Sequence, residues 1–326
     1  AASLAAVKPI QTEGTERMNV MMTRRKLLKL SAKLGAAATA ASLAPRSLWA
    51  SPMGLPIGIQ LYAVKGALQK DPAGTLKRLY AIGYREVETA GYAGMTAAAF
   101  SKLIHDAKLH CPSAHVQFGK TDFSKAFADA HALGAQYAVS SALAFTIIPF
   151  PAPVHGKPPQ IPSLTEDDFK RMADLMNRIG KAARAAGLTY AYHNHNLEFV
   201  RMPDGSYGYD LLLKQTDPDT VKFEGDCGWM VAAGASPVHY FESYPGRYRM
   251  MHVKDFATMA HPTTVLIGPG HPEGRELGHG FIKYGPIFKA AKAAGVQHAF
   301  AEQEAPFAHS ELESAKIDYD YLASFS

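Results

Sequence analysis

The residues of this chain best able to do chemistry are ionisable side chains two positions apart, at the ends of short apolar runs. The pairs are Glu86 and Glu88, His193 and His195, Glu224 and Asp226, His252 and Lys254, and Glu302 and Glu304, and His115 ends another run. Residues two apart share one face of a β-strand. Burying so many charges unpaired would cost too much free energy, so a cation, one another or water must compensate them.

A bound metal ion would account for this collection. Mixed imidazole and carboxylate ligands suit Mn²⁺, Zn²⁺, Co²⁺ or Fe²⁺ better than Ca²⁺, and Mg²⁺ is a further option. A single histidine at a strand end is more often a hydrogen-bonded structural residue than a ligand. Because the pairs recur on several neighbouring strands, we expect one divalent metal ion.

The elements that must position these residues are eight short strands with helices between them. The predicted strands are residues 57–62, 85–90, 112–116, 136–141, 189–195, 221–226, 249–254 and 298–302. Apolar residues at spacings of three and four predict helices that include residues 73–82, 96–107, 123–133, 166–186 and 286–294. Glycines that suit a left-handed helix cap follow four of them, at Gly83, Gly134, Gly187 and Gly295.

This alternation predicts parallel βαβ units. Eight of them in residues 51–326 match the size of a single-domain (β/α)8 TIM barrel. An open doubly wound sheet is the alternative, but it usually carries a glycine-rich phosphate turn after its first strand, and residues 62–66 are not one. Polar residues at the C-terminal ends of barrel strands are typical of an active site.

Two long segments, 145–163 and 256–282, each follow a predicted strand and so belong to the same end of the barrel. The first is rich in proline, and the second carries His261, His271 and His279. Loops of this length without secondary structure are usually functional lids. Surface decoration is the alternative.

The net charge of +5 does not indicate a nucleic-acid partner. Residues 1–50 hold eight basic and two acidic side chains, which leaves 26 basic and 27 acidic residues in 51–326. The body of the chain therefore lacks the basic excess that binding to a phosphate backbone requires.

Residues 1–50 have the parts of an export leader. Arg24-Arg25 precedes the apolar run 34–43, and the paired arginines resemble a twin-arginine signal. The run is too short for a stable membrane anchor, because crossing a bilayer takes about 20 residues. We expect a periplasmic or otherwise exported protein that uses the twin-arginine route. Translation from Met18, Met21 or Met22 would make residues 1–17 an upstream artefact.

Five short segments carry a family likeness. They are Tyr-His-Asn-His-Asn-Leu-Glu-Phe (192–199), Asp-Cys-Gly-Trp-Met-Val-Ala-Ala-Gly (226–234), Met-His-Val-Lys-Asp (251–255), Leu-Gly-His-Gly-Phe-Ile (277–282) and Ala-Glu-Gln-Glu (301–304). In this order they resemble the sugar phosphate isomerase/epimerase family of xylose-isomerase-like barrels, which also includes metal-dependent apurinic endonucleases. The likeness spans residues 57–322.

The resemblance implies one divalent metal held by strands five to eight, at His193, Asp226, His252 and Glu302. Family members commonly have glutamate at the position of His193, so this chain lacks one of the two carboxylates that typical 3-epimerases use. Trp229 stands where apurinic endonucleases have an additional histidine ligand, which argues against that activity.

The resemblance also implies a sugar or sugar derivative as substrate and an enediolate stabilised by the metal. Candidate proton-transfer and polarising residues are Glu302, Glu198, Glu88, His195 and Lys254. Candidate substrate contacts are His115, Trp229, Tyr62 and His279. Reprotonation would make the protein an isomerase or epimerase, which is the first expectation.

Two other functions remain open at this point. Loss of a β-leaving group would make the protein a lyase, for instance on a keto-glycoside. A non-catalytic periplasmic carbohydrate-binding protein would keep the barrel without turnover. The sequence leaves the sugar, the metal and a homo-oligomeric state undecided.

Overall fold

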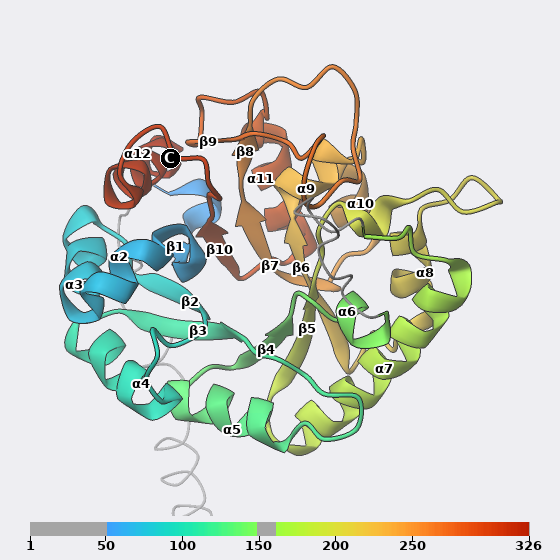
Figure 1. Cartoon of the computed structure of the whole chain (residues 1–326), viewed down its shortest axis with the longest axis horizontal. Helices are drawn as coiled ribbons and strands as arrows, with labels where there is room; N and C mark the ends of the chain where they lie inside the picture. Colours follow the sequence, from blue (N-terminus) through green and yellow to red (C-terminus); the bar gives the residue numbers. More distant parts are fainter. Residues whose placement is uncertain (1–50, 149–160, 326) are drawn as a thin grey trace, which may run out of the picture. The chain divides into compact units, whose positions relative to one another are not determined.

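The computed structural model describes residues 51–148 and 161–325, so the expected leader at 1–50 lies outside the described residues. Parallel strands close into a barrel in the order β1-β10-β7-β6-β5-β4-β3-β2 (Figure 1). They are β1 (Ile57–Gln60), β2 (Glu86–Ala90), β3 (His110–His115), β4 (Tyr137–Ser140), β5 (Thr189–His193), β6 (Val221–Asp226), β7 (Tyr248–Val253) and β10 (His298–Ala301). The predicted (β/α)8 barrel is confirmed, and a strand forms at each of the eight predicted places. Two strands end two residues earlier than predicted, β1 at Gln60 and β5 at His193, so His195 lies beyond its strand.

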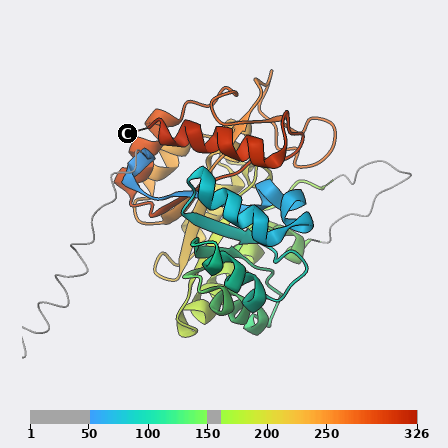
Figure 2. The same ribbon diagram turned by 90° about the vertical axis from the view of Figure 1, so that its left-hand side faces the viewer.

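Helices cover the outside of the barrel (Figure 1, Figure 2). They are α2 (Lys65–Lys70), α3 (Pro72–Ile82), α4 (Ala97–Asp106), α5 (Ser124–Leu133), α6 (Ala144–Ile147), α7 (Glu166–Ala185), α8 (Gly208–Gln215), α9 (Cys227–Ala232), α10 (Pro237–Ser243), α11 (Tyr284–Ala294) and α12 (Glu311–Ala323). Short 3-10 turns are η1 (Pro52–Gly54), η2 (Leu61–Val64) and η3 (Leu197–Phe199). Capping residues in the sequence set the ends of several helices. At the start of α7, for example, Thr165 and Asp168 form a capping box.

Inward-facing side chains fill the barrel in layers. A buried apolar cluster inside the barrel consists of Tyr137, Val139, Ala191, Met250 and Phe300. The Phe300 ring lies over Gly58, where an added Cβ would come within 2.5 Å of it. Each of Ala191, Met250 and Phe300 is followed two positions later by an ionisable residue. These ionisable residues therefore form the next layer, toward the C-terminal ends of the strands.

The long segment after β7 begins and ends near two short paired strands, while its residues 257–273 have no regular secondary structure, as predicted. Here β8 (Asp255–Phe256) pairs antiparallel with β9 (Gly274–Arg275). The Asp255 carboxylate accepts backbone N–H bonds at 2.9 to 3.1 Å from Phe256, Gly278, Gly280 and Ile282. One side chain thus fastens both ends of the segment. In the other predicted loop, residues 149–160 lie outside the described residues.

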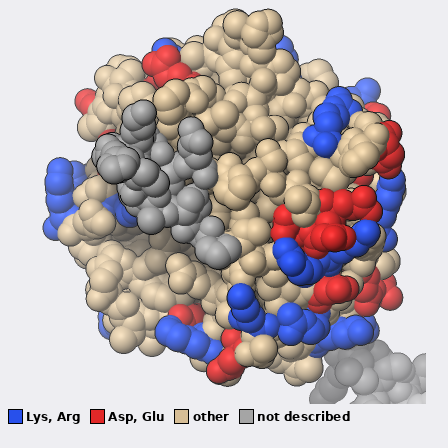
Figure 3. Space-filling model, turned by 45° about the vertical axis from the view of Figure 1, so that its right-hand side comes forward, with Lys and Arg blue, Asp and Glu red and all other residues tan. Residues whose placement is uncertain are grey.

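Surface charges are mixed on the face drawn in Figure 3. Lys and Arg side chains lie beside Asp and Glu side chains there and do not gather in one basic field. Charges of opposite sign also pair on α7, where Lys170 Nζ lies 2.8 Å from Glu166 Oε1. Among the described residues, no helix is both long and apolar enough to cross a membrane.

Candidate metal centre

The four side chains predicted to bind a metal meet at the C-terminal end of the barrel. His193 ends β5, Asp226 ends β6, His252 lies in β7, and Glu302 directly follows β10. Each offers one nitrogen or oxygen atom, and these four atoms lie within 4.8 Å of one another. His193 Nε2 and His252 Nδ1 are each 3.9 Å from Asp226 Oδ2. All four side chains are buried.

The Asp226 carboxylate has one oxygen without a hydrogen-bond partner. Oδ1 accepts the backbone N–H of Trp229 at 2.8 Å and so caps α9. Oδ2 is buried and has no such partner among the described residues. Lys254 Nζ lies 3.5 Å from this oxygen, which makes an ion pair but no hydrogen bond. A buried carboxylate oxygen without a hydrogen bond costs free energy, and a divalent cation would reduce that cost. Two imidazole nitrogens with two carboxylates fit Mn²⁺, Zn²⁺, Co²⁺ or Fe²⁺.

Lys254 lies at the edge of these ligands. Its Nζ is 2.9 Å from Glu302 Oε2 and 3.5 Å from Asp226 Oδ2, and it also pairs with Glu304. Burial alone would lower the pKa of Lys254, but the carboxylates of Glu302, Glu304 and Asp226 outweigh it and raise that pKa. Burial would raise the pKa of Glu302, but Lys254 and His252 hold it below its usual range. At neutral pH Glu302 is therefore ionised and Lys254 is charged.

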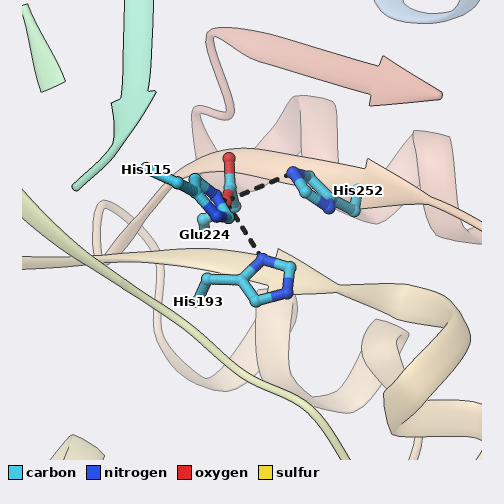
Figure 4. A group of neighbouring side chains, drawn as sticks. All are labelled: His115, His193, Glu224 and His252. Carbon is cyan, nitrogen blue, oxygen red and sulfur yellow. Dashed lines mark hydrogen bonds and ion pairs between the residues drawn. The ribbon is translucent and has the colours of Figure 1, made fainter. Parts of the chain in front are cut away.

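A second group of possible ligands shares two histidines with the first. Figure 4 shows its members, which are His115, His193, Glu224 and His252. Glu224 Oε2 lies 2.8 Å from His115 Nε2, 3.0 Å from His193 Nδ1 and 3.3 Å from His252 Nε2. The carboxylate oxygen therefore fills the space between the three rings. This geometry favours the group with Asp226 and Glu302 as the position for an ion.

Glu88, a predicted proton-transfer residue, is fully engaged in hydrogen bonds. Its Oε2 accepts Gln60 Nε2 at 2.8 Å and lies 2.7 Å from His252 Nε2, while Oε1 accepts the Ser113 hydroxyl. Sequence reasoning missed Gln60 and Ser113. The sequence did contain a signal for Ser113. It precedes His115 by two positions on the same strand, so the two side chains share one face of that strand.

His195 and Glu198 lie in the turn after β5. The centroid of the His195 ring is 5.0 Å from that of His193, and its buried Nδ1 has no hydrogen-bond partner in the described part of the chain. Burial lowers the pKa of His195 to about 3, so its ring is neutral at neutral pH. Glu198 accepts the Tyr192 hydroxyl and the His195 backbone N–H, and burial raises its pKa to about 7.

The predicted substrate-binding residues occupy different environments. His115 lies within the cluster, bonded to Glu224. Trp229 is 0% exposed, with Lys254 Nζ 4.8 Å from its ring centroid. Tyr62 is 41% exposed, and burial followed by the charges of Glu304 and Glu302 raises its pKa, which places it beside the site. His279 is exposed in a turn of the segment after β9, and the structure does not bring it into the cluster.

Known proteins resemble this chain in sequence and in fold. A family model described as xylose isomerase-like TIM barrel matches residues 76–323. A crystal structure of a sugar phosphate isomerase/epimerase from Parabacteroides distasonis ATCC 8503 is 26% identical, with 82% of this chain and 94% of that chain covered and a TM-score of 0.65. A xylose isomerase-like TIM barrel protein from Mycobacterium smegmatis, in complex with magnesium, shares the fold at 17% identity, with 85% and 96% covered and a TM-score of 0.54.

Curated relatives match over shorter stretches of this chain. An inosose dehydratase from Lacticaseibacillus casei is 31% identical over 140 residues, which cover 41% of this chain and 46% of that protein. An inosose dehydratase from Geobacillus thermodenitrificans is 28% identical over 157 residues, which cover 45% of this chain and 52% of that protein. The chain therefore spans about half the length of the curated relatives it matches.

Proposed function

The chain belongs to the xylose isomerase-like TIM barrel family, and from that premise we propose that it is a divalent-metal-dependent isomerase or epimerase of a sugar or sugar derivative. The proposal is carried by the buried group His193, Asp226, His252 and Glu302. In this group Asp226 Oδ2 lacks a hydrogen-bond partner among the described residues. A bound divalent ion would polarise a substrate carbonyl and stabilise the negative charge that develops when a neighbouring C–H proton leaves.

Two side chains are suited to move protons in this reaction. Glu302 is ionised, so its carboxylate can accept a proton from a substrate carbon. Lys254 Nζ, 2.9 Å away, keeps it in this ionised form. The second group for proton transfer is the neutral ring of His195, in the turn after β5. Because β6 and β7 separate β5 from β10 in the barrel, the two groups approach the ligands from different strands. A proton can thus be removed at one position and replaced at another.

A lyase is the second candidate, and two observations favour it. His193 occupies the position where the family commonly has a carboxylate. This leaves two carboxylates among the four ligands, and one of them, Asp226, already accepts the Trp229 N–H, so Glu302 is the candidate base. Elimination needs a single base to remove the proton while the leaving group departs from the neighbouring carbon with the electron pair. The curated relatives named above are dehydratases by name, which also fits removal of a neighbouring group.

Turnover in D₂O by the Mn²⁺-loaded protein separates these functions. A panel of ketoses, aldoses and keto-glycosides would be followed by NMR. A new isomer or epimer with deuterium on carbon, and no released group, supports the proposal. Release of an aglycone or of water supports the lyase. Sugar binding without turnover, unchanged by chelation, contradicts both and leaves a carbohydrate-binding protein.

A matched pair of variants ties the turnover to the site. Glu302→Gln removes the base and is expected to slow turnover at least ~100-fold. Glu86→Gln removes another buried carboxylate, which starts β2 and pairs with His298 Nδ1 at 2.8 Å, at the opposite end of the barrel. This control is expected to retain activity.

We also propose that the protein acts outside the cytoplasm, since Arg24 and Arg25 resemble a twin-arginine signal. Replacing both with lysine in the full chain is expected to move the protein from the periplasmic to the cytoplasmic fraction. An unchanged distribution in cell fractionation would contradict this route.

A further inference from the structure

Both imidazoles among the four ligands are bonded to carboxylates that lie outside the ligand group. His193 Nδ1 is 3.0 Å from Glu224 Oε2, while its other nitrogen, Nε2, faces Asp226 Oδ2. His252 has the opposite arrangement. Its Nε2 is 2.7 Å from Glu88 Oε2. Its Nδ1 is 2.9 Å from the ligand Glu302 Oε2 and 3.9 Å from Asp226 Oδ2.

The chemistry of the imidazole ring gives this arrangement a consequence. A neutral imidazole carries a proton on one nitrogen and a lone pair on the other. An ionised carboxylate only accepts hydrogen bonds, so the nitrogen that faces it must hold the proton. On His193 the opposite nitrogen is then free to bind a cation. On His252 the opposite nitrogen faces Glu302, itself one of the four ligands, so an ion bound between them would take the place of that proton. The hydrogen bond to the outer carboxylate also fixes the plane of each ring.

We infer that Glu224 and Glu88 are positioning residues that make His193 present Nε2, and His252 present Nδ1, to the metal ion. This inference rests on the proposed metal-dependent function. It gives Glu88 a different role from direct proton transfer, in agreement with its complete set of hydrogen bonds. It also gives a role to Glu224, which lies between three histidine rings without being a ligand itself (Figure 4).

The two positioning carboxylates are themselves held by neighbouring strands. His115 Nε2 lies 2.8 Å from Glu224 Oε2 and 3.1 Å from Glu88 Oε2, so one ring from β3 joins them. Gln60 from β1 donates to Glu88 at 2.8 Å, and Ser113 from β3 donates to it as well. Both carboxylates are completely buried. The two positioning carboxylates are therefore held in place by β1 and β3, which supply no ligand.

The test is Co²⁺ affinity, measured by calorimetry, in Glu224→Ala, Glu88→Ala and the control Glu86→Ala. Glu86 lies on the same strand as Glu88 but away from the ligands, and its carboxylate pairs with His298. Loss of an orienting partner is expected to weaken binding by about 10- to 100-fold, whereas the control should bind like the wild type. Glu224→Gln keeps an accepting oxygen and should recover part of the affinity. The visible spectrum of bound Co²⁺ should change only in the Glu224 and Glu88 variants.

The possible results discriminate between the inference and the function on which it rests. Wild-type affinity in both Glu224→Ala and Glu88→Ala, with Co²⁺ bound, would overturn the inference alone. Failure of the wild type to bind Co²⁺ would overturn both. If the alanine variants do not fold, ¹⁵N NMR of the metal-free wild type reports the His193 tautomer directly, with the signal identified by its loss in His193→Gln. A proton on Nδ1 is expected, and a proton on Nε2 would overturn the inference.

Discussion

Asp226 divides its two oxygens between a helix cap and the metal centre. Asp226→Asn keeps an oxygen for the Trp229 N–H and removes the ligand charge. We therefore expect bound metal to fall from stoichiometric to trace levels, while the metal-free variant unfolds close to the wild-type temperature. Asp226→Ala also loses the cap and should cost about 1 kcal/mol of stability. Elemental analysis and thermal unfolding measure these effects, and a stoichiometric ion in Asp226→Asn would contradict the ligand assignment.

At this scale the sequence could predict which residues meet but not how they are bonded. His193, Asp226, His252 and Glu302 were predicted because strand ends in a barrel converge and because the family resemblance ordered them. The position of Glu224 between three rings depends on the exact tilt and stagger of four strands. The bond from Gln60 to Glu88 depends on the pairing of β1 with β2. The spacing of residues along one strand predicts neither the position of Glu224 nor the bond from Gln60 to Glu88.

Among the elements, the segment after β7 depends on one close backbone approach. A Cβ added at Gly280 would lie 2.1 Å from Asp255 Oδ1. Gly280→Ala is therefore expected to displace the Asp255 carboxylate and cost about 1–3 kcal/mol. Gly285→Ala, near the start of α11, meets nothing within 4 Å and should keep or slightly raise stability. Urea unfolding compares the two variants, and equal stabilities would show that Asp255 does not fasten this segment.

Helix α12 holds the same segment through a buried acid. Asp318 Oδ1 accepts the Leu277 N–H at 2.7 Å, and burial raises the pKa of Asp318 from 3.8 to about 7. The folded protein thus binds this proton more tightly than the unfolded chain. The resulting stabilisation is complete below the unfolded pKa of 3.8 and is lost as the pH rises through about 7.

Asp318→Asn keeps an acceptor for Leu277 and removes this titration. Relative to the wild type, its free energy of unfolding should therefore increase as the pH rises across that window. The increase is expected to be on the order of 2–4 kcal/mol. Urea unfolding at a series of pH values measures it. Parallel pH profiles for the two proteins would mean that Asp318 titrates normally in the folded state.

The sequence predicted long elements better than short ones. All eight barrel strands were predicted, since each is an apolar run beside a clear helical pattern. The ladder of β8 and β9 was not, because its strands have two residues each and it depends on the Asp255 carboxylate for support. Such a ladder leaves no periodic pattern in the sequence.

At the scale of the whole molecule, we expect metal binding to raise the temperature of thermal unfolding. Binding to the folded state alone, at 100 times the dissociation constant, adds about 2.7 kcal/mol. For a domain of this size that corresponds to a rise in Tm of roughly 5 °C or more. Scanning calorimetry with Mn²⁺ should show the rise and a chelator should reverse it, while Asp226→Asn should show neither. Equal rises in the wild type and Asp226→Asn would indicate that Mn²⁺ binds elsewhere.

The order of the ligands along the barrel also sets when the protein can acquire its ion during synthesis. The ligands lie on or beside β5, β6, β7 and β10, and β10 must pair with β1 to close the barrel. A ribosome delivers the chain from its N-terminus, so the first half of the barrel emerges with the supporting residues Gln60, Glu88 and Ser113 but without a ligand. The fourth ligand arrives only with the last barrel strand. If the proposed site binds a metal ion, loading would follow translation of the barrel, and a nascent chain stalled before β10 would leave the ribosome without a complete site.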